Sequence, residues 1–403
     1  MIDPETRALL RKHFRWGLLV RMGLAIALYS FTDENLFAPD QTTYRLLGEA
    51  LARYWSGDNV VPPMRLLAGG PTGYFYIVAA FYSVGAGPLA VQLLNCIMGA
   101  LTILIIFDLA LRMTGNAAIA LRSAMFVAYF PSLILWSALN IRDAWIIMLI
   151  ALICRQALVL QEKVSLTGLG ILAVAIWALI QFRNYVLLAV TVPMVVSFLV
   201  RGRSNVGRRV FLGMLGAILV IYADQAAGTG RRVRLLDLEE IQNIRTWNTS
   251  GAASQFEKAD ISTPQKALLF LPKGLAYFLL APFPWMLGSI RQMLALPEML
   301  LFYSLIPSMV IGLRHLLRHH LSNALMVILV TAALTFGYAL GEGNAGTAYR
   351  HRAQLLSFYL MFAAVGIEAR RMRRAEVAAR VLPAARDVAL GREARLRREP
   401  SSQ

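Results

Sequence analysis

The chain has 403 residues, of which 58% are hydrophobic and 16% charged, with a mean hydropathy of +0.57. A soluble globular domain of this length needs more polar surface, so the composition excludes one and predicts an all-α polytopic membrane protein. The formal net charge is +17, and many of the excess arginines follow the last apolar segment without aromatic stacking residues. This pattern favours a cytoplasmic end that contacts membrane lipids and excludes a nucleic-acid partner.

The first apolar segment, at about 14–31, follows several basic residues and predicts a membrane helix that starts in the cytoplasm. The chain behind it carries Glu34 and Asp40 at the opposite membrane surface. After Pro39, the spacing of apolar residues predicts an amphipathic helix that bears Tyr44 and has Asp40 near its N-terminus. Asp40 therefore has two open interpretations, a helix cap or a functional acid.

Further apolar segments predict a bundle of about 10 transmembrane helices with both termini in the cytoplasm. They lie at about 88–111, 117–138, 143–160, 165–182, 185–200, 210–226, 297–313, 323–340 and 354–367. Arginines follow several of these segments at their cytoplasmic ends, as at Arg112, Arg201 and Arg314, which supports the assignment. Residues 1–368 are therefore interpreted as one membrane domain and residues 369–403 as a basic cytoplasmic tail that is partly disordered.

Two larger outer loops, at about 32–87 and 228–295, are expected to carry short interfacial helices. In the first loop, the apolar piece at 74–84 is too short to cross a bilayer. In the second, LLDLEEIQNI predicts an amphipathic helix. The proline-rich stretch behind it, ALLFLPKGLAYFLLAPFPWMLGS, predicts a bent or re-entrant element.

Polar residues from distant segments fall on the outer side of this topology. They are Glu34, Asp40, Arg142, Asp143, Arg183, Glu342, Asn344, Arg350 and Arg352. Ionisable groups at the membrane edge are costly unless they are paired or used, so we expect a shared polar cavity. Simpler interpretations stay open, because Arg142 can pair with its neighbour Asp143 and Arg183 can extend to lipid headgroups.

The outer loop GEGNAGTAYRHR carries the most specific pattern in the second half of the chain. Its glycines allow a close backbone approach, and Arg350 and Arg352 offer planar guanidinium groups that match phosphate oxygens. The loop therefore predicts a site for a lipid-linked phosphate. Arginines that only anchor the chain at the membrane interface are the alternative.

Several of these stretches resemble the GT-C-type glycosyltransferases, especially bacterial relatives of the protein O-mannosyltransferase and aminoarabinose transferase group (glycosyltransferase family 39-like). The similar stretches are PDQTTYRLLGEALA, GGPTGYFYIVAAFYSVGAGPLAVQLLNCIMGALTILIIFDLALRMTG, YFPSLILWSALNIRDAW and the arginine of QFRNY. They cover about the first 200 residues in order, whereas the second half is similar only in layout. Many relatives carry an Asp-Glu pair before the tyrosine, whereas Asp40 is followed by Gln41, and the spacing to Tyr44 favours Asp40 over Asp33 or Glu34 as the catalytic acid.

The resemblance implies transfer of a sugar, with inversion, from a polyprenyl-phosphate-linked donor to a glycan, lipid or protein acceptor on the extracytoplasmic face of a bacterial inner membrane. It implies that Asp40 acts as general base and that Arg350, Arg352 and Arg183 bind the donor phosphate. The expected supporting residues are Asp143, Arg142, Glu342, Asn344, Tyr44 and Glu34. Asp40 and Asp143 could hold Mg or Mn, while other relatives of this group act without a metal.

Two other functions also fit a chain with many spans. An O-antigen-type polymerase or ligase would use outer-loop arginines on lipid diphosphates, but it does not need a large acid-bearing loop directly after the first span. A lipid-linked sugar flippase or transporter would show paired halves with spans broken at matching positions. The sequence shows the acid-bearing loop and no such halves, which favours the transferase.

Overall fold

The computed structural model describes residues 2–58, 72–201, 238–249, 255–285, 288 and 290–396. Its N-terminal half contains α1 (Pro4–Phe31), α2 (Asp40–Trp55), α3 (Gly73–Ser83), α4 (Pro88–Thr114), α5 (Ala117–Tyr129), α6 (Pro131–Ser137), α7 (Asp143–Glu162), α8 (Leu166–Arg183) and α9 (Val186–Arg201). The C-terminal half contains α11 (Leu238–Thr249), α12 (Pro264–Leu280), α13 (Ile290–His319), α14 (Leu321–Gly341) and α15 (Ala345–Leu396). The expected all-α class is confirmed.

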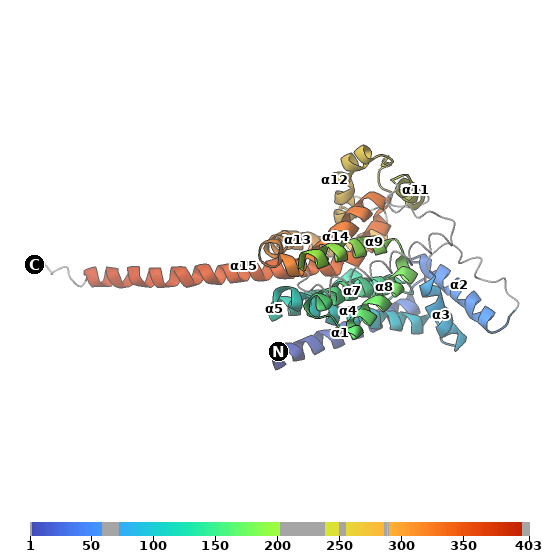
Figure 1. Cartoon of the computed structure of the whole chain (residues 1–403), viewed down its shortest axis with the longest axis horizontal. Helices are drawn as coiled ribbons and strands as arrows, with labels where there is room; N and C mark the ends of the chain where they lie inside the picture. Colours follow the sequence, from blue (N-terminus) through green and yellow to red (C-terminus); the bar gives the residue numbers. More distant parts are fainter. Residues whose placement is uncertain are drawn as a thin grey trace, which may run out of the picture.

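The long helices lie side by side along one axis, and the short helices gather at one end of them (Figure 1). This end, which carries α2, α3, α11 and α12, is called the loop end below. The start of α1 and the far end of α15 lie at the opposite end of the bundle (Figure 1). The start of α1 and the far end of α15 therefore lie on the same side of the bundle.

Six of the described helices are long and apolar enough to cross a membrane, and the bent pair of α5 and α6 makes a seventh candidate. The six are α1, α4, α7, α8, α13 and α14. This confirms a multi-pass membrane protein, with fewer spans in the described residues than the ten expected. Two expected spans, α9 with its 16 residues and the apolar part of α15, do not meet this test, and the segment at 210–226 lies outside the described residues.

The span expected at 117–138 is broken into α5 and α6, which meet at an angle of 56°. Pro131 begins α6, and a proline cannot continue the hydrogen bonding of the preceding helix. The last carbonyls of α5 are instead satisfied by the buried Arg21 of α1, which donates to Val127 O at 2.7 Å and to Ala128 O at 2.8 Å. Arg21 is therefore a structural residue within the bundle.

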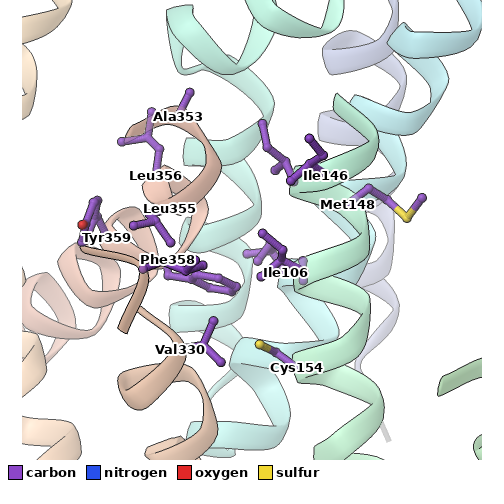
Figure 2. Close-up of a cluster of buried hydrophobic side chains, with 14 of the residues drawn as sticks. Ile106, Ile146, Met148, Cys154, Val330, Ala353, Leu355, Leu356, Phe358 and Tyr359 are labelled. Carbon is purple, nitrogen blue, oxygen red and sulfur yellow. The ribbon is translucent and has the colours of Figure 1, made fainter. Parts of the chain in front are cut away.

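The first part of α15 is buried inside the protein and is packed on several helices rather than on lipid. Phe358 and Leu355 of α15 point towards Ile106 of α4 and Val330 of α14 (Figure 2). α15 and α13 pack closely at Gly366. A Cβ atom added to this glycine would lie 1.9 Å from Ser308 O of α13, so there is no room for a side chain. Beyond this core α15 continues as a helix to Leu396. The rest of the tail expected at 369–403 lies outside the described residues.

The short helices of the outer loops form largely where the sequence predicts them. Gly73–Ser83 covers the expected interfacial piece, and Leu238–Thr249 begins inside LLDLEEIQNI. The proline-rich stretch forms α12, which continues through Pro272 and ends before Pro282. α12 packs on α14 and α15, so it brings the second outer loop over the N-terminus of α15.

Candidate active site

Arg350, near the N-terminus of α15, joins two carboxylates that come from opposite parts of the chain. Its Nη1 donates to Asp40 Oδ2 at 2.6 Å, and its Nε donates to Asp143 Oδ2 at 2.8 Å. Nη2 lies 2.6 Å from the same Asp143 oxygen. The Asp143 side chain is fully buried, whereas the Asp40 side chain is 52% exposed. The arrangement therefore has a fixed inner acid and an accessible outer acid.

Asp143 is held by a second side chain of α15. Gln354 Nε2 donates to Asp143 Oδ1 at 3.1 Å, and Tyr338 of α14 donates to Gln354 Oε1 at 2.7 Å. Arg350 and Gln354 are four residues apart, so they share one face of the helix. Both oxygens of Asp143 thus accept hydrogen bonds, and this buried carboxylate fixes the direction of the Arg350 side chain.

Asp40 is placed by the start of α2. Pro39 occupies the cap position and no side chain caps this helix, so the capping interpretation of Asp40 is wrong and its carboxylate faces Arg350. The next residue, Gln41, is buried, and its Oε1 accepts from the backbone N–H of Asn140 at 2.7 Å. One turn later Tyr44 packs edge to face on Tyr74, with ring centroids 4.8 Å apart. Burial raises the pKa of Tyr44, which keeps the phenol protonated at neutral pH.

A buried amide network shapes the turn before Asp143. Asn95 Nδ2 donates to the Tyr74 hydroxyl at 2.7 Å and to the carbonyls of the turn, and its Oδ1 accepts from Trp145 Nε1 at 2.8 Å. The Tyr74 hydroxyl in turn donates to Asn140 Oδ1 at 2.9 Å. These bonds satisfy backbone groups that the turn leaves without helix partners. They also connect the two loops that carry Asp40 and Asp143.

Arg183, at the end of α8, reaches the same region through His351. Arg183 Nη2 lies 2.9 Å from His351 Nε2, and His351 Nδ1 contacts Glu342 Oε1. A guanidinium can only donate, so His351 Nε2 must accept and the neutral ring carries its proton on Nδ1. Burial lowers the pKa of His351, in agreement with this tautomer. Burial alone would raise the pKa of Glu342, but the neighbouring His351 and Arg183 lower it.

Two arginines of this region keep unused hydrogen-bond donors. Nε and Nη1 of Arg183 are buried and have no hydrogen-bond partner in the part of the chain that the structure describes. Arg142 Nε is also buried and has no hydrogen-bond partner among the described residues. Arg142 does not pair with Asp143, because Arg350 and Gln354 occupy that carboxylate. Arg142, Arg183 and Arg350 all interact electrostatically with groups of one cluster, which also contains the carboxylates of Asp40, Asp143 and Glu342.

Residues 70–223 match the sequence profile of a family described as dolichyl-phosphate-mannose-protein mannosyltransferase. The matched segment includes Arg142, Asp143 and Arg183, and it agrees with the resemblance found in the sequence. The match covers less than half of the chain, and it shows that this part is similar to the GT-C membrane glycosyltransferases. A search among curated proteins gave no match. The family match does not extend to Asp40 or Arg350, which the fold brings to Asp143.

Arg352 has other partners than Arg350. Its Nη1 donates to the carbonyls of Ala281, Leu279 and Phe278 at 2.7, 2.9 and 3.2 Å, at the C-terminal end of α12. These carbonyls have no partner within their helix, and a buried cation there also interacts favourably with the helix dipole. Arg352 therefore attaches α12 to α15 through its Nη1.

Three expected supporting residues take structural positions beside the acids. Glu34 pairs with Arg45 Nε at 3.1 Å, which attaches the first loop to α2. Asn344 caps α15, because its Oδ1 accepts from the backbone N–H of Thr347 at 2.9 Å. Glu342 contacts His351 rather than Asp40 or Arg350. All three shape the loops that carry the site.

The described residues do not provide a ready divalent-cation site. They contain no group of three or more His, Cys, Asp or Glu side chains with suitable geometry. Asp40 and Asp143, the proposed metal ligands, direct oxygens at the Arg350 guanidinium, and the second Asp143 oxygen accepts from Gln354. These two carboxylates therefore bind the guanidinium cation of Arg350.

The sequence analysis missed several residues that hold this arrangement. Gln354 could have been found, because it follows Arg350 by one helical turn. Arg245 of α11 had no such pattern, yet its Nη1 donates to Glu342 O at 2.6 Å and holds the loop before α15. Asn95 and Tyr74 lie in segments that read as ordinary apolar helices, and only the folded chain joins them.

Proposed function

We propose that this protein transfers a sugar from a polyprenyl-phosphate-linked donor to an acceptor hydroxyl on the extracytoplasmic face of the membrane, with inversion. The family match supports a glycosyltransferase that uses a lipid-linked donor. Asp40 begins α2, which lies at the loop end away from the start of α1 and the far end of α15 (Figure 1), and Arg350 contacts it there. A basic cytoplasmic end would place this loop end outside. The single observation that carries the proposal is the contact of Arg350 with both Asp40 and Asp143.

Asp40 is the proposed general base. Its carboxylate is accessible, whereas Asp143 is buried and has both oxygens engaged. In the reaction, Asp40 takes the proton of the acceptor hydroxyl while the hydroxyl oxygen forms a bond to the anomeric carbon. The bond between that carbon and the phosphate oxygen breaks at the same time, and the lipid phosphate leaves with the electron pair. Attack opposite the leaving group inverts the anomeric centre.

Arg350, Arg183 and Arg142 are the proposed ligands of the donor phosphate. Arg183 and Arg142 keep buried N–H groups without partners in the described residues, and such groups are costly unless a ligand uses them. Arg350 adds a fixed charge beside Asp40. Preorganised cations stabilise the negative charge that develops on the departing phosphate. This set replaces Arg352 of the sequence prediction by Arg142.

A donor phosphate would compete with Asp40 for Arg350 Nη1. The inner arms of Arg350 stay with the buried Asp143, so the outer arm is the one that can change partner. A carboxylate that loses its cation becomes a stronger base. Binding of the donor is therefore expected to activate Asp40 at the moment when the base is required.

A direct assay with defined donors tests the proposal. The purified protein, reconstituted in lipid, is incubated with a panel of polyprenyl-phosphate sugars and a membrane extract that contains acceptors. We expect consumption of at least one donor, with release of polyprenyl phosphate, and no consumption by the Asp40→Asn variant. The matched control is Glu49→Gln, which removes a carboxylate from another part of α2. Equal consumption by wild type and Asp40→Asn would rule out Asp40 as the base.

A further inference from the structure

A second polar pocket lies at the loop end, between the end of α1, the loop that follows it, and the starts of α2 and α4. Its volume is about 190 Å³. The lining residues are Leu28, Tyr29, Thr32, Asp33, Glu34, Phe37, Gln41, Arg45, Pro88, Gln92, Leu139 and Asn140. A drug-sized ligand needs about 300–1,000 Å³, so this pocket has room for a single small ring.

Two buried amides of the pocket lack hydrogen-bond partners in the described part of the chain. Gln92 is 6% exposed and its Oε1 has none; Asn140 is 1% exposed and its Nδ2 has none. Tyr74 uses only the other amide atom of Asn140, the oxygen. A buried acceptor and a buried donor left open beside one cavity indicate a ligand that can both donate and accept hydrogen bonds.

The charges of the lining exclude an anionic ligand. Asp33 and Glu34 contribute two negative charges, and the one cation among the lining residues, Arg45, is already paired with Glu34 and Glu49. A phosphate would meet repulsion here, whereas the arginine cluster attracts it on the Arg350 side. Hydroxyl groups match the pocket best, because each one is both a donor and an acceptor.

We infer that this pocket binds a neutral pyranose ring of the acceptor. The pocket adjoins the proposed base, because Gln41 lines it and the preceding residue is Asp40. Gln41 also connects the pocket to the turn before Asp143 through its bond to the backbone N–H of Asn140. A sugar ring bound by Gln92 and Asn140 would lie beside the start of α2, the helix that carries Asp40. The inference rests on the proposed function and specifies a glycan as the acceptor class.

The test measures binding of simple glycosides without any transfer reaction. Methyl α-D-mannopyranoside, methyl β-D-glucopyranoside and methyl β-D-galactopyranoside are added separately to the protein in lipid nanodiscs, and saturation-transfer NMR detects the bound ring. We expect a signal from at least one glycoside and a decrease of at least fivefold in Gln92→Met, which keeps the size of the side chain and removes its amide. Because the Gln92 amide has no protein partner among the described residues, Gln92→Met is expected to melt at or above the wild-type temperature.

Arg350→Ala is the matched comparison, since it removes the proposed phosphate ligand and leaves the pocket lining unchanged. We expect it to retain glycoside binding and to lose donor consumption. Absence of a signal from all three glycosides, or an equal signal in Gln92→Met, overturns the inference and means that water alone fills the pocket. Glycoside binding without consumption of any donor would instead remove the proposed transferase reaction and keep the pocket as a sugar site.

Discussion

Arg350 and Asp40 are 310 residues apart in the chain, and Arg350 Nη1 donates to Asp40 Oδ2 at 2.6 Å. The same guanidinium is held from behind by Asp143, which is fully buried. One arginine thus faces a fixed acid on the inside and an accessible acid on the outside. This relationship gives each of the three residues a different expected effect on donor binding and on catalysis.

Replacement of Asp40 by Asn should remove the chemical step and keep donor binding. Asparagine has a similar shape but cannot accept a proton from a hydroxyl, and general-base catalysis is worth about 10²–10⁴-fold. We therefore expect kcat to decrease by about 100-fold or more. The donor KM should fall or stay unchanged, because Arg350 becomes fully available to the phosphate. Steady-state kinetics with the donor identified by the panel would measure both values, and a large rise in donor KM with normal kcat would contradict the base assignment.

Replacement of Arg350 by Ala should weaken binding of the donor more than binding of the acceptor. Hydrogen bonds to a charged group contribute about 1.5–3 kcal/mol, which corresponds to roughly 10–100-fold in affinity. We expect the donor KM to rise by about this factor. Arg350→Lys restores the charge but not the three-sided contact, so it should recover only part of the loss. An unchanged donor KM in Arg350→Ala would argue against phosphate binding at this position.

Replacement of Arg352 by Ala should lower stability rather than donor affinity. The side chain satisfies three carbonyls at the end of α12, and its removal leaves buried acceptors without partners. We expect a loss of about 3 kcal/mol, read as a lower melting temperature in detergent. The folded fraction should keep a normal donor KM. The pair Arg350→Ala and Arg352→Ala therefore separates a ligand-binding arginine from a structural one only two residues away.

The activity should decrease at acidic pH, as the pH falls through the lowered pKa of His351. Burial lowers the pKa of His351, so the neutral ring that accepts from Arg183 is present at pH 7. Below the ordinary pKa the unfolded chain binds a proton first, so stability decreases as the pH falls from about 6.5 to the lowered value in the folded state. Protonation would also turn Nε2 into a donor that faces the Arg183 guanidinium.

A glutamine at position 351 provides the control for this pH dependence. Its side chain can accept from Arg183 and donate to Glu342, but it does not titrate. Profiles of kcat/KM between pH 5 and 8 should therefore differ between wild type and His351→Gln only on the acidic side. Superimposable profiles would show that His351 does not control the response.

Periodicity and apolar length predict the class of this fold and most of its helices, because these patterns follow from local burial. They do not predict that the span at 117–138 breaks at Pro131, since the cost of the break is removed by Arg21 from another helix. They also assign the apolar part of α15 to lipid contact, although it is buried in protein. Hydropathy does not distinguish these two apolar environments.

Some residues of the candidate site could likewise be predicted from the sequence, and others could not. Asp40, Asp143 and Arg350 could be selected from the sequence because each is an ionisable residue at the predicted membrane edge. The direction of each side chain depends on long-range contacts. The spacing of Arg350 and Arg352 in the sequence therefore could not show that the two arginines have different roles. Gln354, Asn95 and Arg245 act through neighbours that are distant in sequence, which no local pattern contains.

The position of Arg350 also depends on the close packing of α13 and α15, which two glycines permit. A Cβ on Gly312 would lie 1.8 Å from Phe362 O, and one on Gly366 would lie 1.9 Å from Ser308 O. Because backbone atoms oppose each site, a side chain can be accommodated only if the helices separate. We expect Gly366→Val to destabilise the protein by about 3 kcal/mol or more and to lower transfer activity.

Gly337 of α14 is the matched control, because a Cβ there meets no atom within 4 Å. In a helix interior alanine is favoured over glycine by about 0.8–1.0 kcal/mol, so Gly337→Ala should leave the melting temperature unchanged or raise it slightly. Melting curves of the two variants in the same detergent provide the measurement. Equal stability of Gly366→Val and wild type would mean that α13 and α15 do not pack at this distance, and the alignment of Arg350 with Asp40 would then need another support.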